Sequence, residues 1–131
     1  MHLKEYFETK KGFGVLSTAD REGRVNAAIF ARPHVMDNQT VAFIMPDRLT
    51  HANLQSNPHG AYLFLEKEAG YKGVRLHLRK LSEEQDSELL QTLRRKTYPA
   101  ELDEKEAPRY LVIFRVDKVL PLLSAQECPV K

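Results

Sequence analysis

The residues from Pro46 to Pro58, PDRLTHANLQSNP, place an arginine and a threonine where an apolar run ends and a short helix is expected to begin. A helix N-terminus presents free backbone N–H groups and the positive end of its dipole, so it favours an anion. The guanidinium of Arg48 adds a planar fork that matches phosphate oxygens. A helix cap by Thr50 and a solvent-exposed Arg48 explain the same residues equally well. The stretch alone therefore leaves a phosphate site and a plain helix cap open.

A second arginine lies on a neighbouring predicted strand. Arg32 ends a strand face that it shares with Ala28 and Phe30, and this strand is expected to be the hairpin partner of the one before Arg48. In that arrangement the two guanidinium groups can approach one anion. The small residues Ala27 and Ala28 would let a planar ligand lie close to the backbone, although small residues also suit a crowded barrel interior.

Other kinds of site find less support. The single cysteine, Cys128, excludes an intramolecular disulfide and a cysteine-based zinc site, and its position next to Pro129 does not favour a catalytic thiol. The histidines lack metal-ligand spacing, and His51 and His59 flank the short helix without an acidic partner at a ligand-like interval. Carboxylates between positions 83 and 106 are expected to face solvent. We therefore expect no metal and identify no catalytic residue.

The elements that must position these residues follow from the periodicity of the chain. Helices are expected at residues 2–10, at residues 50–56, and from the capping-box pattern Ser82–Gln85 to about residue 96. Strands are expected at residues 13–19, 24–31, 40–45, 60–67, 74–81 and 110–119. Turns at 20–23 and 37–39 connect the first three strands, residues 99–108 are expected to form a surface loop, and residues 124–131 a loose tail.

This order predicts one mainly β domain over residues 1–131, with short helices outside. Six short strands joined by turns favour an antiparallel sheet closed into a small barrel, because closure removes exposed edges. The formal charge of +2 indicates neither nucleic-acid nor membrane binding. No apolar run is long enough to span a bilayer. With one cysteine, a cytoplasmic location is expected.

Three stretches resemble the pyridoxamine 5'-phosphate oxidase-like FMN-binding split-barrel family. They are GVLSTADREGRVNAAIF, TVAFIMPDRLTHANLQSNPHGAYLFLEK and GVRLHL, and the resemblance covers roughly residues 3–80. Its core is an apolar strand, a short basic and hydroxyl segment, and then the pattern NL..NP..AYLF. The resemblance implies a six-stranded antiparallel split β-barrel of Greek-key type, which forms a homodimer and binds FMN at the subunit interface, with residues from both chains.

The resemblance also implies which residues surround the cofactor. Those expected beside the flavin ring are Asn26, Ala27, Ala28 and Ile29 on one side and Phe43, Ile44 and Met45 on the other. Those expected at the phosphate are Arg32, Arg48 and Thr50, with Asn53 as a further polar contact to the flavin. Leu49 stands where many relatives carry a lysine or arginine, which leaves open a shifted, a weaker or a lost phosphate contact.

Two classes of function remain from the sequence. The first is an FMN-dependent oxidoreductase that transfers a hydride or an electron to a small substrate, with a small-molecule substrate or a nicotinamide donor as its partner. The residues that bind substrate in the true pyridoxamine 5'-phosphate oxidases are not found, so that activity is not expected. The second is a binding protein for a flavin, a deazaflavin or haem without turnover, or a dimer whose cofactor site has decayed.

Overall fold

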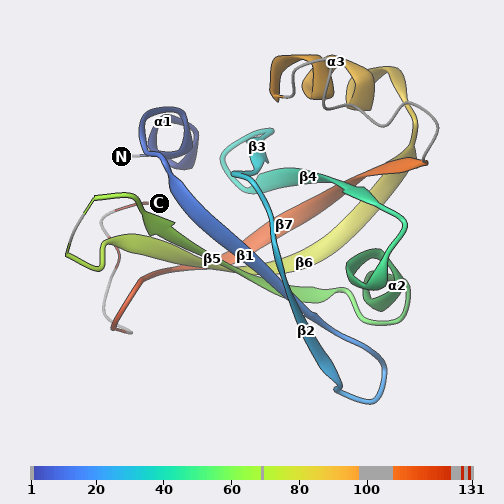
Figure 1. The fold of residues 1–131 in the computed structure, drawn as a ribbon, viewed down its shortest axis with the longest axis horizontal. Helices are drawn as coiled ribbons and strands as arrows, with labels where there is room; N and C mark the ends of the chain where they lie inside the picture. Colours follow the sequence, from blue (N-terminus) through green and yellow to red (C-terminus); the bar gives the residue numbers. More distant parts are fainter. Residues whose placement is uncertain (1, 69, 98–107, 125–127, 129, 131) are drawn as a thin grey trace.

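The computed structural model of the chain describes residues 2–68, 70–97, 108–124, 128 and 130. Its strands are β1 (Gly12–Ala19), β2 (Val25–Ile29), β3 (His34–Val35), β4 (Thr40–Pro46), β5 (His59–Glu66), β6 (Gly73–Gln85) and β7 (Arg109–Pro121). Its helices are α1 (Leu3–Thr9), α2 (Leu49–Ser56) and α3 (Glu88–Thr97). Figure 1 shows how these elements follow one another along the chain.

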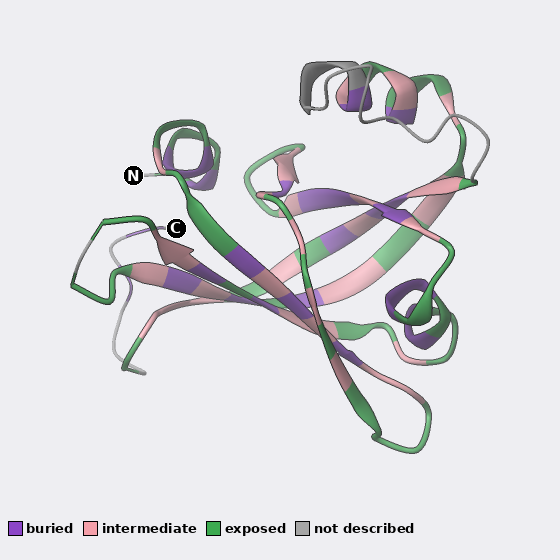
Figure 2. Cartoon of the chain, in the orientation of Figure 1, coloured by how far each residue is buried: buried purple, intermediate pink, exposed green. Residues whose placement is uncertain are grey.

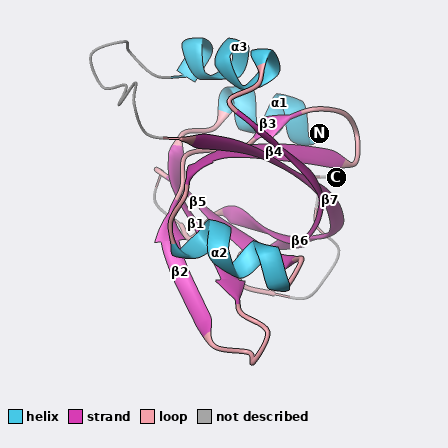
Figure 3. Ribbon diagram, turned by 90° about the vertical axis from the view of Figure 1, so that its right-hand side faces the viewer, coloured by secondary structure: helices cyan, strands magenta, loops and turns pink. Residues whose placement is uncertain are grey.

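The described strands form one antiparallel sheet of seven strands in the order β2-β1-β5-β6-β7-β4-β3. The sheet curls into a barrel, which Figure 3 shows end-on with the helices outside the ring of strands. The mainly β split-barrel class is therefore confirmed. The strand count differs, because the short strand β3 was not expected.

The barrel core follows from the alternation of side chains along each strand. On β6, Val74, Leu76 and Leu78 point inward and are almost fully buried, whereas His77 on the other face is exposed, as the sequence predicted. Figure 2 shows the same alternation of buried and exposed residues on neighbouring strands. Phe43 and Tyr62 meet inside the barrel with their ring centroids 4.9 Å apart. The core is therefore one continuous apolar and aromatic cluster.

Two helices pack against the barrel in different places. The predicted face of α1, which consists of Leu3, Tyr6 and Phe7, is buried in the barrel core. Helix α3 instead packs on the outside of the barrel, where Leu90 contacts a second apolar cluster formed with β4 and β7. The expected start of this helix at Ser82–Gln85 is wrong, because that segment extends β6 and pairs with residues 110–113 of β7. The helix begins after Ser87, whose hydroxyl accepts a hydrogen bond of 3.1 Å from the Leu90 N–H.

The expected hairpin between β2 and β4 is also wrong. Strand β2 ends at Ile29 and pairs only with β1, and the two-residue strand β3 is the partner of β4 at Val41 and Ala42. The two ends of the sheet, β2 and β3, are consecutive in the chain. The barrel is therefore split between β2 and the half of β4 that β3 does not reach.

The C-terminal segment is more ordered than expected where the structure describes it. Cys128 is 5% exposed and Val130 is 8% exposed, and both belong to the barrel core. The expectation of a loose tail is wrong for these two residues. The expected loop at 99–108 lies outside the described residues except for Pro108. Among the described helices, none has the length and apolar character to cross a membrane.

Candidate functional site

A cavity of about 310 Å³ lies where the barrel is split, between β2 and the segment that connects β4 to α2. It is lined by Asn26, Ala28, Ile29, Phe30, Ala31, Ile44, Pro46, Arg48, Leu49 and Thr50. Six of these residues were expected at the cofactor: Asn26, Ala28, Ile29, Ile44, Arg48 and Thr50. Because β2 pairs only with β1, its other edge offers unpaired backbone N–H and C=O groups to a ligand.

The first turn of α2 forms one end of this cavity. Arg48 occupies the N-cap position in an extended conformation, and its side chain makes no capping hydrogen bond. The first intrahelical hydrogen bond runs from the Ala52 N–H to the Arg48 carbonyl over 2.9 Å. The N–H groups of residues 49–51 therefore precede the helical ladder. Thr50 lies in the second helical position and is 6% exposed, so it does not act as the plain N-cap considered above.

The Arg48 side chain is exposed at the rim of the cavity. Within the part of the chain that the structure describes, its guanidinium forms no hydrogen bond or ion pair with another side chain. A charged fork held beside unbonded helix N–H groups suits a phosphate or another oxyanion. This end of the cavity therefore has the chemistry of an anion site.

Arg32 is not brought to this site. Its guanidinium donates two hydrogen bonds of 2.8 Å, to the carbonyls of Phe7 and Lys10 at the end of α1. The last carbonyls of a helix lack intrahelical partners, and a basic side chain satisfies them. Arg32 and Arg48 therefore do not approach one anion in this structure, contrary to the expectation from the β2–β4 hairpin.

Four other expected residues lie outside the cavity lining. Phe43 and Met45 point into the barrel core, because alternation along β4 turns Ile44 and Pro46 toward the cavity instead. Asn53 is 5% exposed, and its amide donates a hydrogen bond of 3.1 Å to the Thr18 hydroxyl. Ala27 is exposed between two lining residues of β2. The backbone of Ala27 is part of the free edge of β2, but its side chain does not line the cavity.

Sequence reasoning missed four residues of the lining: Phe30, Ala31, Pro46 and Leu49. Phe30 shares the face of Asn26 and Ala28, so alternation was a usable signal for it. Leu49 has 57% of its surface exposed. An exposed apolar side chain at the rim of a cavity is suited to cover a ligand ring or to meet a second protein surface.

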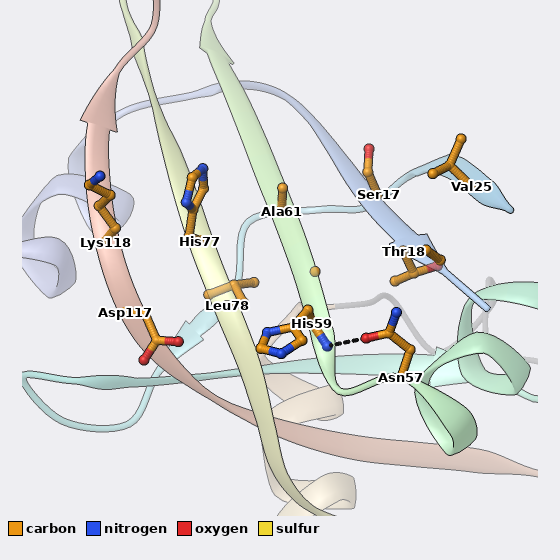
Figure 4. A pocket seen from close by; sticks show the side chains of 12 residues that line it. Ser17, Thr18, Val25, Asn57, His59, Ala61, His77, Leu78, Asp117 and Lys118 are labelled. Carbon is orange, nitrogen blue, oxygen red and sulfur yellow. Dashed lines mark hydrogen bonds between the residues drawn. The ribbon is translucent and has the colours of Figure 1, made fainter. Parts of the chain in front are cut away.

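A larger groove of about 560 Å³ lies on the outer face of the sheet. Figure 4 shows Ser17, Ala61, His77 and Lys118 side by side on four neighbouring strands. The strand register places these four residues opposite one another from β1 to β7. Small side chains on β1 and β5 and polar ones on β6 and β7 make this groove a wide, shallow surface, and none of the residues assigned to the cofactor lines it.

Behind the first turn of α2, His51 lies between two carboxylates. Its Nδ1 is 2.9 Å from Asp47 Oδ1 and its Nε2 is 3.0 Å from Glu83 Oε2. Burial alone would raise the pKa of Glu83, but hydrogen bonds from Gln55, Lys80 and His51 outweigh it and lower the pKa to about 2. The sequence predicted no acidic partner for His51 at a ligand-like interval, whereas the structure gives it hydrogen-bond partners in Asp47, four positions before it, and in Glu83. Over the described residues, no group of histidine, cysteine and carboxylate side chains is arranged to hold a metal ion.

The fold defines a split β-barrel protein with a cavity at the open seam. The chain matches the pyridoxamine 5'-phosphate oxidase family over residues 2–120, and it belongs to that family. A comparison with curated proteins finds no match.

Solved structures share the fold at low sequence identity. An FMN-binding protein from Syntrophomonas wolfei subsp. wolfei has a TM-score of 0.74 at 19% identity, over 95% of this chain and 85% of that chain. An F420 reductase has a TM-score of 0.67 at 20% identity, over 95% and 98%. HutZ, the haem storage protein from Vibrio cholerae, has a TM-score of 0.66 at 17% identity, over 92% and 94%. The chain is thus similar in fold to proteins that hold different cofactors.

Proposed function

We propose that this protein binds FMN without a covalent bond and acts as an oxidoreductase on a small substrate, with a nicotinamide as electron donor. The observation that carries the proposal is the cavity at the barrel split, where an anion site meets a free strand edge. Arg48 and the first N–H groups of α2 would hold the phosphate. The ring would lie along β2, where Ala28 lets the backbone come close.

The cavity favours a flavin over haem. A protein-bound haem takes an axial ligand such as histidine, cysteine, methionine or tyrosine. None of the described residues that line the cavity is of these types. The fold likeness to a haem storage protein therefore does not extend to a ligand for iron in this cavity. A deazaflavin shares the planar ring and a phosphate, so it is the competing ligand that the experiment below must distinguish.

FMN supplies the hydride and electron transfer chemistry, and the protein supplies binding and orientation. The described lining residues include no acid or base other than the Arg48 guanidinium. Backbone N–H groups on the free edge of β2 would bond the polar edge of the ring and fix its direction. Ile29, Ile44 and Leu49 would exclude water from its faces. The chain therefore contributes position and access control, not proton transfer.

We further propose that the protein is a homodimer with the cofactor site at the subunit interface. The outer face of β1, β2 and β5 carries exposed apolar side chains: Val25 is 83% exposed, Ile29 75%, Phe13 67% and Leu63 41%. Val15 lies between Ile29 and Leu63 in the strand register, so this surface is continuous. An edge strand with such a surface is normally covered. Ile29 also lines the cavity, so a second copy on this face would complete the site.

Absorbance spectroscopy tests the cofactor. Purified protein is mixed in turn with FMN, with a deazaflavin and with haem, desalted, and its spectrum recorded. Retention of FMN alone, followed by anaerobic bleaching on addition of NADH or NADPH, supports a flavin oxidoreductase. Retained FMN that neither nicotinamide reduces supports a binding protein instead. Retention of the deazaflavin or haem in preference to FMN contradicts the assignment.

A cytoplasmic location is part of this proposal, in keeping with a single cysteine.

A further inference from the structure

Tyr62 of β5 is buried inside the barrel and contacts both sides of the split. Its side chain points inward, where it is fully buried. Its hydroxyl donates a hydrogen bond of 3.1 Å to the carbonyl of Phe30, which follows β2 and lines the cavity. Its ring lies against the ring of Phe43 on β4, with centroids 4.9 Å apart and planes at 56°. One side chain therefore connects the end of β2 to β4 across the interior of the barrel.

The hydrogen bond from Tyr62 acts at the residue where β2 leaves the sheet. Beyond the last pair of the ladder between β1 and β2, the Phe30 N–H donates to the Gly14 carbonyl over 3.0 Å. The Phe30 carbonyl accepts from Tyr62. The Phe30 ring packs edge-on against Phe43, with centroids 5.9 Å apart and planes at 85°. Both backbone groups and the ring of Phe30 are thus held, and this fixes how the chain enters the cavity lining.

Glycine at position 14 makes the bond to Phe30 possible. A Cβ atom at Gly14 would overlap the Tyr62 hydroxyl and would lie 2.7 Å from the Phe30 carbonyl oxygen. Any side chain there would therefore push the hydroxyl away from its acceptor. Burial raises the pKa of the Tyr62 phenol, so the group remains a neutral hydrogen-bond donor. This tyrosine belongs to the AYLF stretch, residues 61–64, on which the family resemblance partly depends.

We propose that Tyr62 is a positioning residue that sets the width of the cavity at the split, because it holds the end of β2 at a fixed distance from β4. Tyr62 lies outside the cavity lining, whereas Phe30 and Ala31 line one side and Ile44, next to Phe43, lines the other. In the proposed binding mode the flavin ring lies along β2, so the width of the cavity affects the ring and not the phosphate. The consequence for flavin binding rests on the proposed function. The coupling between Tyr62 and Phe30 does not depend on it.

A first experiment tests this coupling without a ligand. In Tyr62→Phe the Phe30 carbonyl loses its donor, and we expect the Phe30 amide hydrogen to exchange about two- to tenfold faster by NMR, the effect of one neutral hydrogen bond. Tyr6→Phe is the matched control, because Tyr6 is also buried and its hydroxyl donates a hydrogen bond of 2.6 Å to Glu66, away from the cavity lining. Urea denaturation measures the stability that each variant loses, and only Tyr62→Phe should speed exchange at Phe30. Equal exchange in the two variants, or the wild-type rate in Tyr62→Phe, overturns the proposal.

A second experiment adds the ligand. In fluorescence titrations, Tyr62→Phe should weaken FMN and riboflavin by the same factor, about two- to tenfold, because both carry the ring that meets the altered cavity. Substitution of Arg48 should affect FMN alone, and Tyr6→Phe should leave both affinities unchanged. If the wild type binds neither flavin while exchange at Phe30 responds to Tyr62→Phe, the proposed function fails and the role of Tyr62 in shaping the cavity stands. If the wild type binds flavin, unchanged affinities in Tyr62→Phe, or a loss confined to FMN, overturn that role.

Discussion

The amide of Asn53 donates a hydrogen bond of 3.1 Å to the hydroxyl of Thr18, and both side chains are buried. This bond joins the middle of α2 to the inner face of β1. Strand β1 pairs with β2 in the sheet. The bond therefore sets the distance between α2 and the free edge of β2. Asn53 therefore shapes the cavity without lining it.

Asn53→Ala should destabilise the fold by about 1–3 kcal/mol, because it leaves the buried Thr18 hydroxyl without its donor. Urea denaturation followed by circular dichroism measures this change. Thr18→Val in the same background removes the orphaned hydroxyl and should recover part of the loss. If the double variant loses as much free energy of unfolding as the two single variants lose together, the two side chains are not coupled.

Arg48→Ala should weaken the binding of FMN about ten- to a hundredfold, the effect of losing one charge-assisted hydrogen bond. Riboflavin binding should change little, because only FMN carries the phosphate. Fluorescence quenching titrations measure both affinities. Arg21→Ala removes an equally charged, exposed residue in the β1–β2 turn and serves as the control. Equal losses for FMN and riboflavin would remove Arg48 from the phosphate site.

Leu63→Arg should convert the proposed dimer into monomers, because it places a charge in the middle of the apolar outer face. Light scattering at micromolar concentration measures the mass. Leu81 is 52% exposed and lies on a different strand, β6, so Leu81→Arg controls for the added charge. A wild-type protein that is already monomeric under these conditions would contradict the dimer.

Glu83 should make stability depend on pH in the acid range. Its pKa falls from an ordinary 4.5 to about 2, so the unfolded chain binds more protons between these values. The stabilisation is therefore present above pH 4.5 and is lost as pH falls toward 2. Its side chain is 24% exposed, so we expect a modest effect of about 1–2 kcal/mol. Thermal melts of wild type and Glu83→Gln should differ most near pH 6 and converge in acid. A constant difference would exclude the ionisation of Glu83 as its cause.

Local patterns predicted most of the individual elements. The apolar spacing of Leu3, Tyr6 and Phe7 identified α1, and strict alternation identified the buried side of β6. The prediction of a helix start at Ser82–Gln85 was wrong because a capping-box pattern expresses only a local preference. Pairing of these residues with β7 gives the backbone a complete set of partners, and that tertiary effect outweighs the local signal.

The site was predictable in part for the same reason. Arg48 and Thr50 stand at a strand-to-helix junction that the sequence marks clearly, and the structure brings them to β2. Arg32 failed because its placement depends on which strands pair. A turn between consecutive strands suggested a β2–β4 hairpin, whereas β2 ends early and Arg32 meets the end of α1. Strand pairing depends on long-range contacts, which local patterns in the sequence do not show.

The unpaired edge of β2 gives the protein a built-in reporter of occupancy. Amide hydrogens that face the split have no strand partner and should exchange with solvent fast in the free protein, whereas those that face β1 exchange slowly. A molecule that bonds this edge slows exchange at alternate residues of β2 only. Deuterium uptake over Val25–Ile29, measured by mass spectrometry, would therefore detect any ligand that bonds this edge, including one that does not absorb visible light.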